Sequence, residues 1–295
     1  MITRRSFVGG LAAAGGAAAL GEACRSNGCG KPGSPVFGLC AGPESAAKFK
    51  KLGFRFIESN AQSILQAEKS DDEWQPMFAK LKACPLPIRS CTIFLPGKFR
   101  ITGPEPKTEE ALKHAVTECR RADLLGIPVL VFGSSGARNA PKGFSVEKAK
   151  EQFVAFCQKL GDAIRDCKVT VILEPLQKKE ANYLNLVEEG IDMVDAINRP
   201  RIQLHADLFH MAKGGEKPDI IRKGGARIRH CHVASFKTRQ YPGSDKEDYR
   251  PWFAAFRDIG YTGVYSCECG WGKKEEREAN YAKGLAYLTE QAAGF

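Results

Sequence analysis

The sequence predicts a single domain of the α/β class, folded as a closed (β/α)8 barrel. Its 295 residues, 43% apolar and 26% charged, suit an ordinary globular protein, and such a barrel needs about 250 residues. Short apolar runs alternate with amphipathic stretches at a regular spacing, which is typical of a parallel sheet built from βα units. Polar residues of metal-binding type stand at the ends of several of these runs.

Eight apolar runs are expected to form the strands. They span residues 36–40, 54–58, 88–95, 128–133, 169–174, 202–207, 228–234 and 263–268. Helices are expected over residues 44–52, 108–125, 145–166, 183–197 and 248–259, where apolar residues recur at helical spacing. Ser145 is a typical helix start, and Gly126 and Gly260 follow the last turns of two helices. No glycine-rich dinucleotide-binding turn follows any strand, which favours a closed TIM barrel over an open doubly wound sheet.

Residues 1–34 are expected to form a signal peptide and linker, and residues 35–295 the barrel. Arg4 and Arg5 precede an apolar, Ala/Gly-rich run that ends at Leu20. This arrangement resembles a twin-arginine export signal, which implies recognition by the Tat export machinery and a periplasmic or exported protein. The run is too short to cross a bilayer comfortably, so no membrane span is expected in the mature chain. Lipid anchoring at Cys24 is less favoured than cleavage before it, because the three preceding residues fit a lipoprotein signal poorly.

The charge pattern argues against nucleic acid as a partner. The formal net charge is +10, but the basic residues are spread over helical stretches instead of forming long blocks. Aromatic residues do not alternate with them, as a surface that stacks bases would require.

Four polar residues at strand ends indicate a metal site. Glu174, Asp207 and Glu268 end the fifth, sixth and eighth strands, and His232 lies near the end of the seventh. A carboxylate at the end of an apolar run is costly to bury unless it is paired or binds a cation. Because the carboxyl ends of the strands meet at one mouth of the barrel, a divalent ion would relieve the repulsion among these groups. Three oxygens and one imidazole favour Mn²⁺, Mg²⁺ or Co²⁺, with Zn²⁺ as an alternative.

The other candidates near this mouth are less specific. His230 lies two residues before His232 and faces the same side of its strand, so either imidazole could be the ligand. His114 and His205 are expected to have structural roles. Glu58 ends the second strand without an assigned partner.

Four segments follow one another in an order known from one family of barrels. They are Leu173-Glu174-Pro175-Leu176, Asp207-Leu208-Phe209-His210-Met211, His230-Cys231-His232-Val233-Ala234 and Tyr265-Ser266-Cys267-Glu268. Together they resemble the sugar isomerase/epimerase superfamily, the xylose isomerase-like barrels that include ketose 3-epimerases, hydroxypyruvate isomerases and inosose dehydratases. The stretch that contains them, from Val171 to Trp271, covers about a third of the chain.

The resemblance implies a role for each matching residue. It implies that the metal ligands are Glu174, Asp207, His232 and Glu268, and that Glu174 and Glu268 also transfer the proton. It implies that substrate oxygens contact Glu180, His210 and Arg239. Residues 177–179 and Ser235 depart from the family pattern, and both departures fall in loops expected to face the substrate.

The expected function is a divalent-metal-dependent sugar isomerase or epimerase that works through an enediolate. Its partner would be a small-molecule sugar or polyol-ketone. One alternative is a dehydratase that uses the same site on a keto-polyol, and another is a non-catalytic carbohydrate-binding barrel. A barrel endonuclease is disfavoured, because its multi-zinc cluster needs more than the five histidines present. The sequence leaves the oligomeric state open, a homo-oligomer included.

Overall fold

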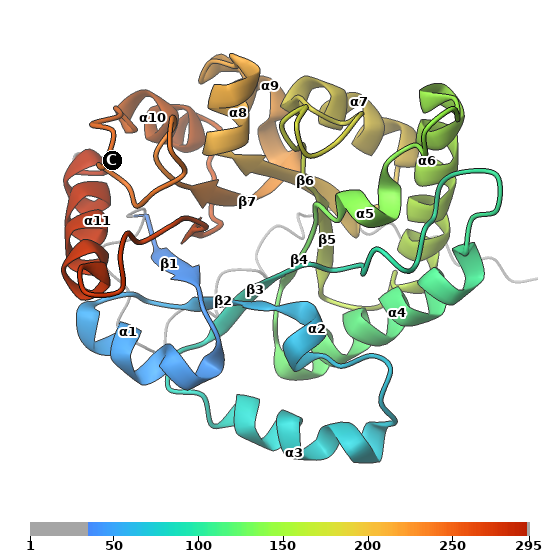
Figure 1. Cartoon of the computed structure of the whole chain (residues 1–295), viewed down its shortest axis with the longest axis horizontal. Helices are drawn as coiled ribbons and strands as arrows, with labels where there is room; N and C mark the ends of the chain where they lie inside the picture. The colour runs from blue at the N-terminus through green and yellow to red at the C-terminus, as the bar shows by residue number, and fades with distance from the viewer. Residues whose placement is uncertain (1–34, 294–295) are drawn as a thin grey trace, which may run out of the picture. The chain divides into compact units, whose positions relative to one another are not determined.

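The computed structural model, which describes residues 35–293, is a closed barrel of eight parallel strands surrounded by helices (Figure 1). The strands are β1 Phe37–Cys40, β2 Ile57–Asn60, β3 Ile88–Thr92, β4 Val129–Phe132, β5 Thr170–Leu173, β6 Ile202–Asp207, β7 Ile228–Val233 and β8 Tyr265–Cys267. Each strand pairs with its sequence neighbours, and β8 pairs with β1 to close the ring. The predicted fold class is confirmed.

The helices form an outer ring around the barrel (Figure 1). They are α1 Ala46–Leu52, α2 Ala61–Ile64, α3 Asp71–Lys82, α4 Thr108–Leu125, α5 Ser135–Arg138, α6 Val146–Ala163, α7 Val187–Ile197, α8 Leu208–Gly214, α9 Asp219–Gly224, α10 Arg250–Asp258 and α11 Arg277–Gln291, with 3-10 turns η1 Pro43–Ser45 and η2 Gly225–Arg227. Local signals fix several ends: Ser70 and Glu73 form a capping box at the start of α3, and Gly126 ends α4 with a φ of 72°.

The inner face of the barrel is polar toward the carboxyl ends of the strands. Because side chains alternate along a strand, Ile172 and Glu174 share one face of the fifth strand, and His205 and Asp207 share one face of the sixth. All four side chains are buried. A small apolar cluster around Ile172 is separate from the large core between the sheet and the helices. Burying polar side chains costs free energy, so these residues indicate a functional site at the carboxyl ends of the strands.

Several predicted elements are longer than the observed ones, and two of them are cut short beside a residue with a left-handed backbone. The third strand ends at Thr92 because Ile93 takes a left-handed backbone conformation, with φ 57°. Helix α7 begins at Val187 instead of residue 183, because Leu184 has φ 54° and the Tyr183 carbonyl accepts a hydrogen bond from Arg138. The shortened end of the third strand lines the cavity described below.

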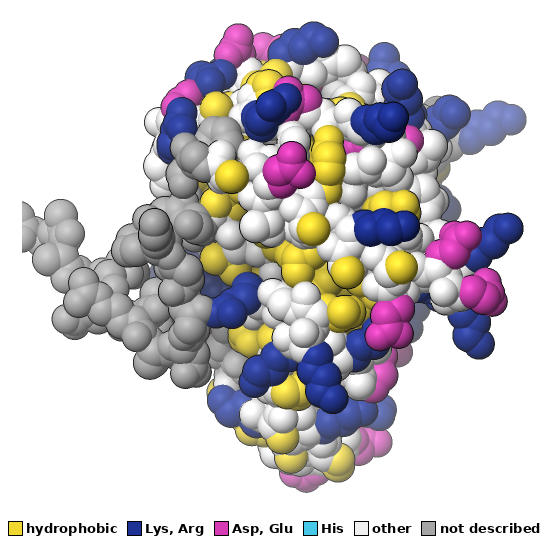
Figure 2. All heavy atoms as spheres, turned by 90° about the vertical axis from the view of Figure 1, so that its left-hand side faces the viewer, with side chains coloured by type: hydrophobic (Ala, Val, Ile, Leu, Met, Phe, Trp, Pro, Cys, Tyr) yellow, Lys and Arg dark blue, Asp and Glu magenta, His cyan; other side chains and the backbone are white. Residues whose placement is uncertain are grey.

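The face of the molecule that Figure 2 shows carries side chains of both charges. There, Lys and Arg side chains are spread among acidic, apolar and other groups (Figure 2). Within residues 35–293, no helix is both long enough and apolar enough to cross a membrane. The predicted signal peptide and linker, residues 1–34, lie outside the described residues, as does Cys24.

Candidate active site

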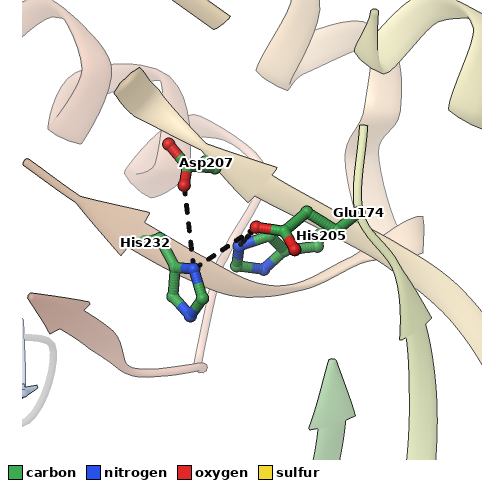
Figure 3. Close-up of side chains that lie close together, drawn as sticks. All are labelled: Glu174, His205, Asp207 and His232. Atoms are coloured by element: carbon green, nitrogen blue, oxygen red, sulfur yellow. Dashed lines mark ion pairs between the residues drawn. The ribbon is translucent and has the colours of Figure 1, made fainter. Parts of the chain in front are cut away.

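Four predicted ligands meet at the mouth of the barrel. Glu174 follows β5, Asp207 ends β6, His232 lies in β7 and Glu268 follows β8. The distances from His232 Nδ1 are 3.5 Å to Glu174 Oε1, 3.7 Å to Asp207 Oδ2 and 3.3 Å to Glu268 Oε2. In Figure 3, the polar atoms of Glu174, Asp207 and His232 point toward one another.

These atoms fit a divalent cation. Glu174 Oε1, Asp207 Oδ2 and His232 Nδ1 are buried, and none has a hydrogen-bond partner among the described residues. Burying charged oxygens without partners costs several kcal/mol by order of magnitude, so a missing cation is the simplest account. Ligand atoms about 2.0–2.3 Å from one ion lie roughly 3–3.7 Å apart, which matches the observed spacing of 3.3–3.7 Å.

Glu58 contacts His232 at the ring nitrogen opposite the one that faces Glu174, Asp207 and Glu268. Both Glu58 oxygens lie 3.1 Å from His232 Nε2, and Oε2 lies 3.0 Å from His230 Nε2. A proton on His232 Nε2 that donates to Glu58 leaves Nδ1 as the ligand atom, an arrangement common behind metal-binding histidines. Although burial opposes it, the carboxylates of Glu58 and Glu268 raise the pKa of His232 well above its usual value. Of the two candidate histidines, the structure turns His232 toward the carboxylates and His230 toward Glu58.

His205 is a member of the cluster that sequence reasoning left out. Its Nε2 lies 3.6 Å from Glu174 Oε1, and neither ring nitrogen has a hydrogen-bond partner within residues 35–293. One ligand atom from each of Glu174, His205, Asp207 and His232 lies within 4.8 Å of the others. The structural role that was expected for His205 is therefore not the full description of this residue, because it also belongs to the group of possible metal ligands. The period-two pattern of a strand, which puts His205 on the same face as Asp207, was the available signal.

Asp207 has two separate tasks. Its Oδ1 caps α8 by accepting hydrogen bonds from Phe209 N at 2.7 Å and His210 N at 3.0 Å, which leaves Oδ2 for the site. Burial opposes ionisation, but His210, His232 and Arg239 together hold the pKa of Asp207 well below its usual value. The carboxylate is therefore fixed in place and charged.

The three predicted substrate contacts lie together beside the ligands. Arg239 Nη2 lies 2.5 Å from Glu268 Oε2, and its Nη1 lies 3.5 Å from Glu180 Oε1. His210 Nδ1 accepts a hydrogen bond from Gln177 N at 3.2 Å, so Nε2 carries the proton and faces Glu180 Oε2 at 3.9 Å. Gln177 also donates to Glu180 at 2.6 Å, so this departure from the family pattern belongs to the substrate-contact cluster.

Ser235 lies in the predicted loop after His232, but its side chain does not line the cavity described below. Its side chain is fully buried, and its Oγ accepts a hydrogen bond from Gln240 N at 2.9 Å and lies 2.9 Å from Thr238 Oγ1. The chain turns sharply just after β7, and Ser235 closes that turn. It therefore shapes the loop that carries Arg239, whose own φ is 55°.

A cavity of about 390 Å³ opens beside the ligands. It is lined by residues that follow β5, β7 and β8, namely Glu174, Leu176, Glu180, Arg239 and Glu268, and by residues at or after the ends of β3 and β4, namely Thr92, Ile93, Leu95, Pro96, Gly97, Gly133, Ser134, Ser135 and Gly136. Its size lies within the range of about 300–1,000 Å³ for small-molecule sites. The cavity is thus lined by charged side chains together with small and apolar residues.

Comparison with known proteins identifies the family. A family model described as a xylose isomerase-like TIM barrel matches residues 46–291. The chain belongs to this family. The resemblance drawn from the four sequence segments is therefore confirmed at the level of the family.

The relatives within the xylose isomerase-like family include sugar epimerases and isomerases. The chain is 32% identical to an L-ribulose 3-epimerase of Methylomonas sp. (strain DH-1) over 117 residues, which is 39% of this chain and 40% of that enzyme's length. It is 25% identical over 176 residues to a 2-oxo-tetronate isomerase of Pectobacterium atrosepticum, covering 58% of this chain and 66% of the relative. A crystal structure of a D-psicose 3-epimerase in the presence of D-fructose superposes with a TM-score of 0.76 at 20% identity, covering 88% and 100% of the two chains. The likeness to this crystal structure supports the fold alone.

Proposed function

We propose that this chain is a divalent-metal-dependent isomerase or epimerase of a sugar or related polyol-ketone, which transfers a proton through an enediolate. The convergence of unpartnered Glu174 Oε1, Asp207 Oδ2 and His232 Nδ1 carries the proposal, since these buried atoms meet beside the cavity. The ketose 3-epimerases and isomerases among the relatives support the reaction class.

In this proposal Glu174, Asp207, His232 and Glu268 hold the ion. When bound, it would polarise the substrate carbonyl and the adjacent hydroxyl, and so stabilise the negative charge that develops as the neighbouring C–H proton leaves. Three carboxylates and one imidazole favour Mn²⁺, Mg²⁺ or Co²⁺. Participation of His205 would add a second nitrogen and shift the preference toward Zn²⁺.

Glu174 and Glu268 are proposed to move the proton. They approach from different strands, β5 and β8, so they can address different faces of one substrate carbon. One carboxylate takes the C–H proton, and the other carboxylic acid returns a proton to the opposite face, which inverts the configuration and conserves all atoms. His210 Nε2–H and Arg239 would donate hydrogen bonds to substrate oxygens.

The cavity favours a neutral keto-sugar over a sugar acid. Among the described residues, Arg239 is the single cationic side chain that lines the cavity, and Glu268 and Glu180 already pair with it. A substrate carboxylate would therefore meet more negative than positive charge there. D-psicose and L-ribulose, which occur in the names of two relatives, should therefore be tested as substrates before 2-oxo-tetronate.

Solvent deuterium uptake tests this function directly. Protein stripped with a chelator and reloaded with Mn²⁺ is incubated with each sugar in D2O, and deuterium at the carbon next to the carbonyl is measured by mass spectrometry. We expect uptake that needs metal and that Glu268→Gln abolishes. Glu118→Gln is the control, because Glu118 is a buried carboxyl that does not line the cavity, and burial raises its pKa.

The outcomes separate the alternatives. Wild-type uptake in Glu268→Gln would contradict the assigned role of that carboxylate. A product lighter by one water would replace the epimerase with a dehydratase. Sugar binding without metal and without exchange would indicate a non-catalytic barrel.

We also propose that the protein is exported through the twin-arginine route. Arg4 and Arg5 before the apolar run support this, and export of a folded chain would allow the metal to be loaded before the protein leaves the cytoplasm.

A further inference from the structure

Arg138, the last residue of α5, is a fully buried cation without an acidic partner. Its exposure is 0%, and no carboxylate within residues 35–293 lies within ion-pair distance of it. Instead, the guanidinium donates to three backbone carbonyls: Nε to Gly133 O at 2.8 Å, Nη1 to Tyr183 O at 2.8 Å and Nη2 to Glu174 O at 3.1 Å. Burying a guanidinium is costly even where carbonyl oxygens accept its hydrogen bonds and the nearby Glu174 carboxylate favours its charge, so its position calls for a reason beyond packing.

The three carbonyls belong to the segments that form one wall of the candidate site. Gly133 follows β4, Glu174 follows β5, and Tyr183 lies in the loop that also carries Glu180. The planar fork of an arginine can bind several acceptors in a fixed geometry, which a lysine or a neutral side chain cannot do. Arg138 therefore sets the spacing between the ends of two neighbouring strands.

That spacing matters for Glu174 in particular. A Cβ on Gly133 would lie 2.1 Å from Glu174 Oε2, so the carboxylate rests directly against the β4 backbone that Arg138 holds. A change in the relative position of the two strand ends would move the Glu174 oxygens away from His232 Nδ1. The ligand atom Oε1 now lies 3.5 Å from that nitrogen.

The contacts around Arg138 are reciprocal, which makes the arrangement rigid. Tyr183 Oη donates to Arg138 O at 2.5 Å, and the guanidinium lies 5.4 Å from the centre of the Tyr183 ring. Next to it, Asn139 donates to Glu180 O at 3.2 Å and accepts from Asn182 N at 3.2 Å. The short α5 helix thus holds both Glu174 and the loop of Glu180.

We propose that Arg138 is a positioning residue for the metal-binding carboxylate of Glu174, acting through the backbone carbonyls of Gly133 and Glu174. The inference rests on the proposed function only in that Glu174 is a ligand. It assigns Arg138 no contact with substrate or metal. Burial lowers the pKa of Arg138, but a guanidinium stays charged at neutral pH.

Binding of Mn²⁺ alone, measured by titration calorimetry on chelator-stripped and folded protein, tests the proposal. Arg138→Met removes all three hydrogen bonds, and we expect its Mn²⁺ affinity to fall about 10- to 100-fold, the usual effect of losing a residue that orients a ligand. Arg138→Lys keeps the charge and most of the volume, and should recover part of that loss. It also serves as the deciding variant if Arg138→Met does not fold.

Arg121→Met is the matched control. Arg121 on α4 is also buried and also donates to backbone carbonyls, those of Leu65, Gln66 and Lys69, far along the chain from the ligands. Its loss should lower the unfolding midpoint but leave the Mn²⁺ affinity within about two-fold of wild type, because it holds no ligand segment.

Wild-type Mn²⁺ affinity in a folded Arg138 variant would overturn the proposal, and so would an equal loss in Arg121→Met. Failure of the proposed function looks different. In that case the wild-type protein binds Mn²⁺, Arg138 variants bind it more weakly, and no sugar takes up deuterium.

Discussion

Adding one methyl group at Gly133 is expected to disable the site while leaving the fold intact. The new Cβ would lie 2.1 Å from Glu174 Oε2, whereas real Cβ contacts are essentially never shorter than 3.0 Å. The carboxylate must therefore retreat by at least 3.0 − 2.1 = 0.9 Å. Gly133 does not have a positive φ, so alanine fits its backbone, and the end of a glutamate side chain can move at little cost.

A displacement of about 1 Å at a catalytic group can lower a rate about 100-fold. We therefore expect Gly133→Ala to reduce metal-dependent deuterium uptake by roughly two orders of magnitude, with an unfolding midpoint equal to or slightly above that of wild type. Uptake is followed by mass spectrometry at saturating sugar and Mn²⁺, and unfolding by circular dichroism.

Gly42→Ala provides the control. A Cβ there would also lie 2.1 Å from a carboxylate oxygen, that of Glu44, but Glu44 is exposed and Gly42 does not line the cavity. This variant should keep wild-type uptake. Full uptake in Gly133→Ala would refute the placement of Glu174 in the reaction.

We make three further predictions, which rest on a hydrogen bond, on a raised pKa and on a sequence motif. Glu58→Gln should weaken Mn²⁺ binding about 10- to 100-fold in calorimetry, because His232 loses the carboxylate that fixes its ring; unchanged binding would contradict that role. Burial raises the pKa of Glu216 to about 7 from 4.5, so the folded state gains stability below the unfolded pKa and loses it as pH rises through 7. The midpoint should fall between pH 5 and 8 in wild type more than in Glu216→Gln; parallel curves would disprove this. Replacing Arg4 and Arg5 with lysine should retain the protein in the cytoplasm, as fractionation would show, and normal export would rule out the twin-arginine proposal.

The sequence predicts best those features that depend on a few neighbouring residues. The regular spacing of the apolar runs predicted the barrel fold. The carboxylates that end those runs, such as Glu174 and Asp207, lie at one mouth because parallel strands end together. The ends of elements were harder to predict where the backbone is unusual. The left-handed conformation of Ile93 cannot be read from a β-branched residue that normally extends a strand.

Residues whose roles depend on distant partners were missed. Glu58 gains its role from His230 and His232, which lie 172 and 174 positions away along the chain. Among the described residues, no carboxylate lies within ion-pair distance of Arg138 and could have suggested its role. Its acceptors are backbone carbonyls, whose positions cannot be predicted from the amino-acid sequence. Ser235 lies in a loop that was expected to face the substrate, but hydrogen bonds in the turn after β7 hold its side chain inside the protein.

Anomalous diffraction from a crystal soaked in Mn²⁺ tests the central claim most directly. We expect one strong peak, about 2.0–2.3 Å from Glu174 Oε1, Asp207 Oδ2, His232 Nδ1 and a Glu268 oxygen. A protein that shows no peak at this mouth, or binds Mn²⁺ only at other residues, would contradict it.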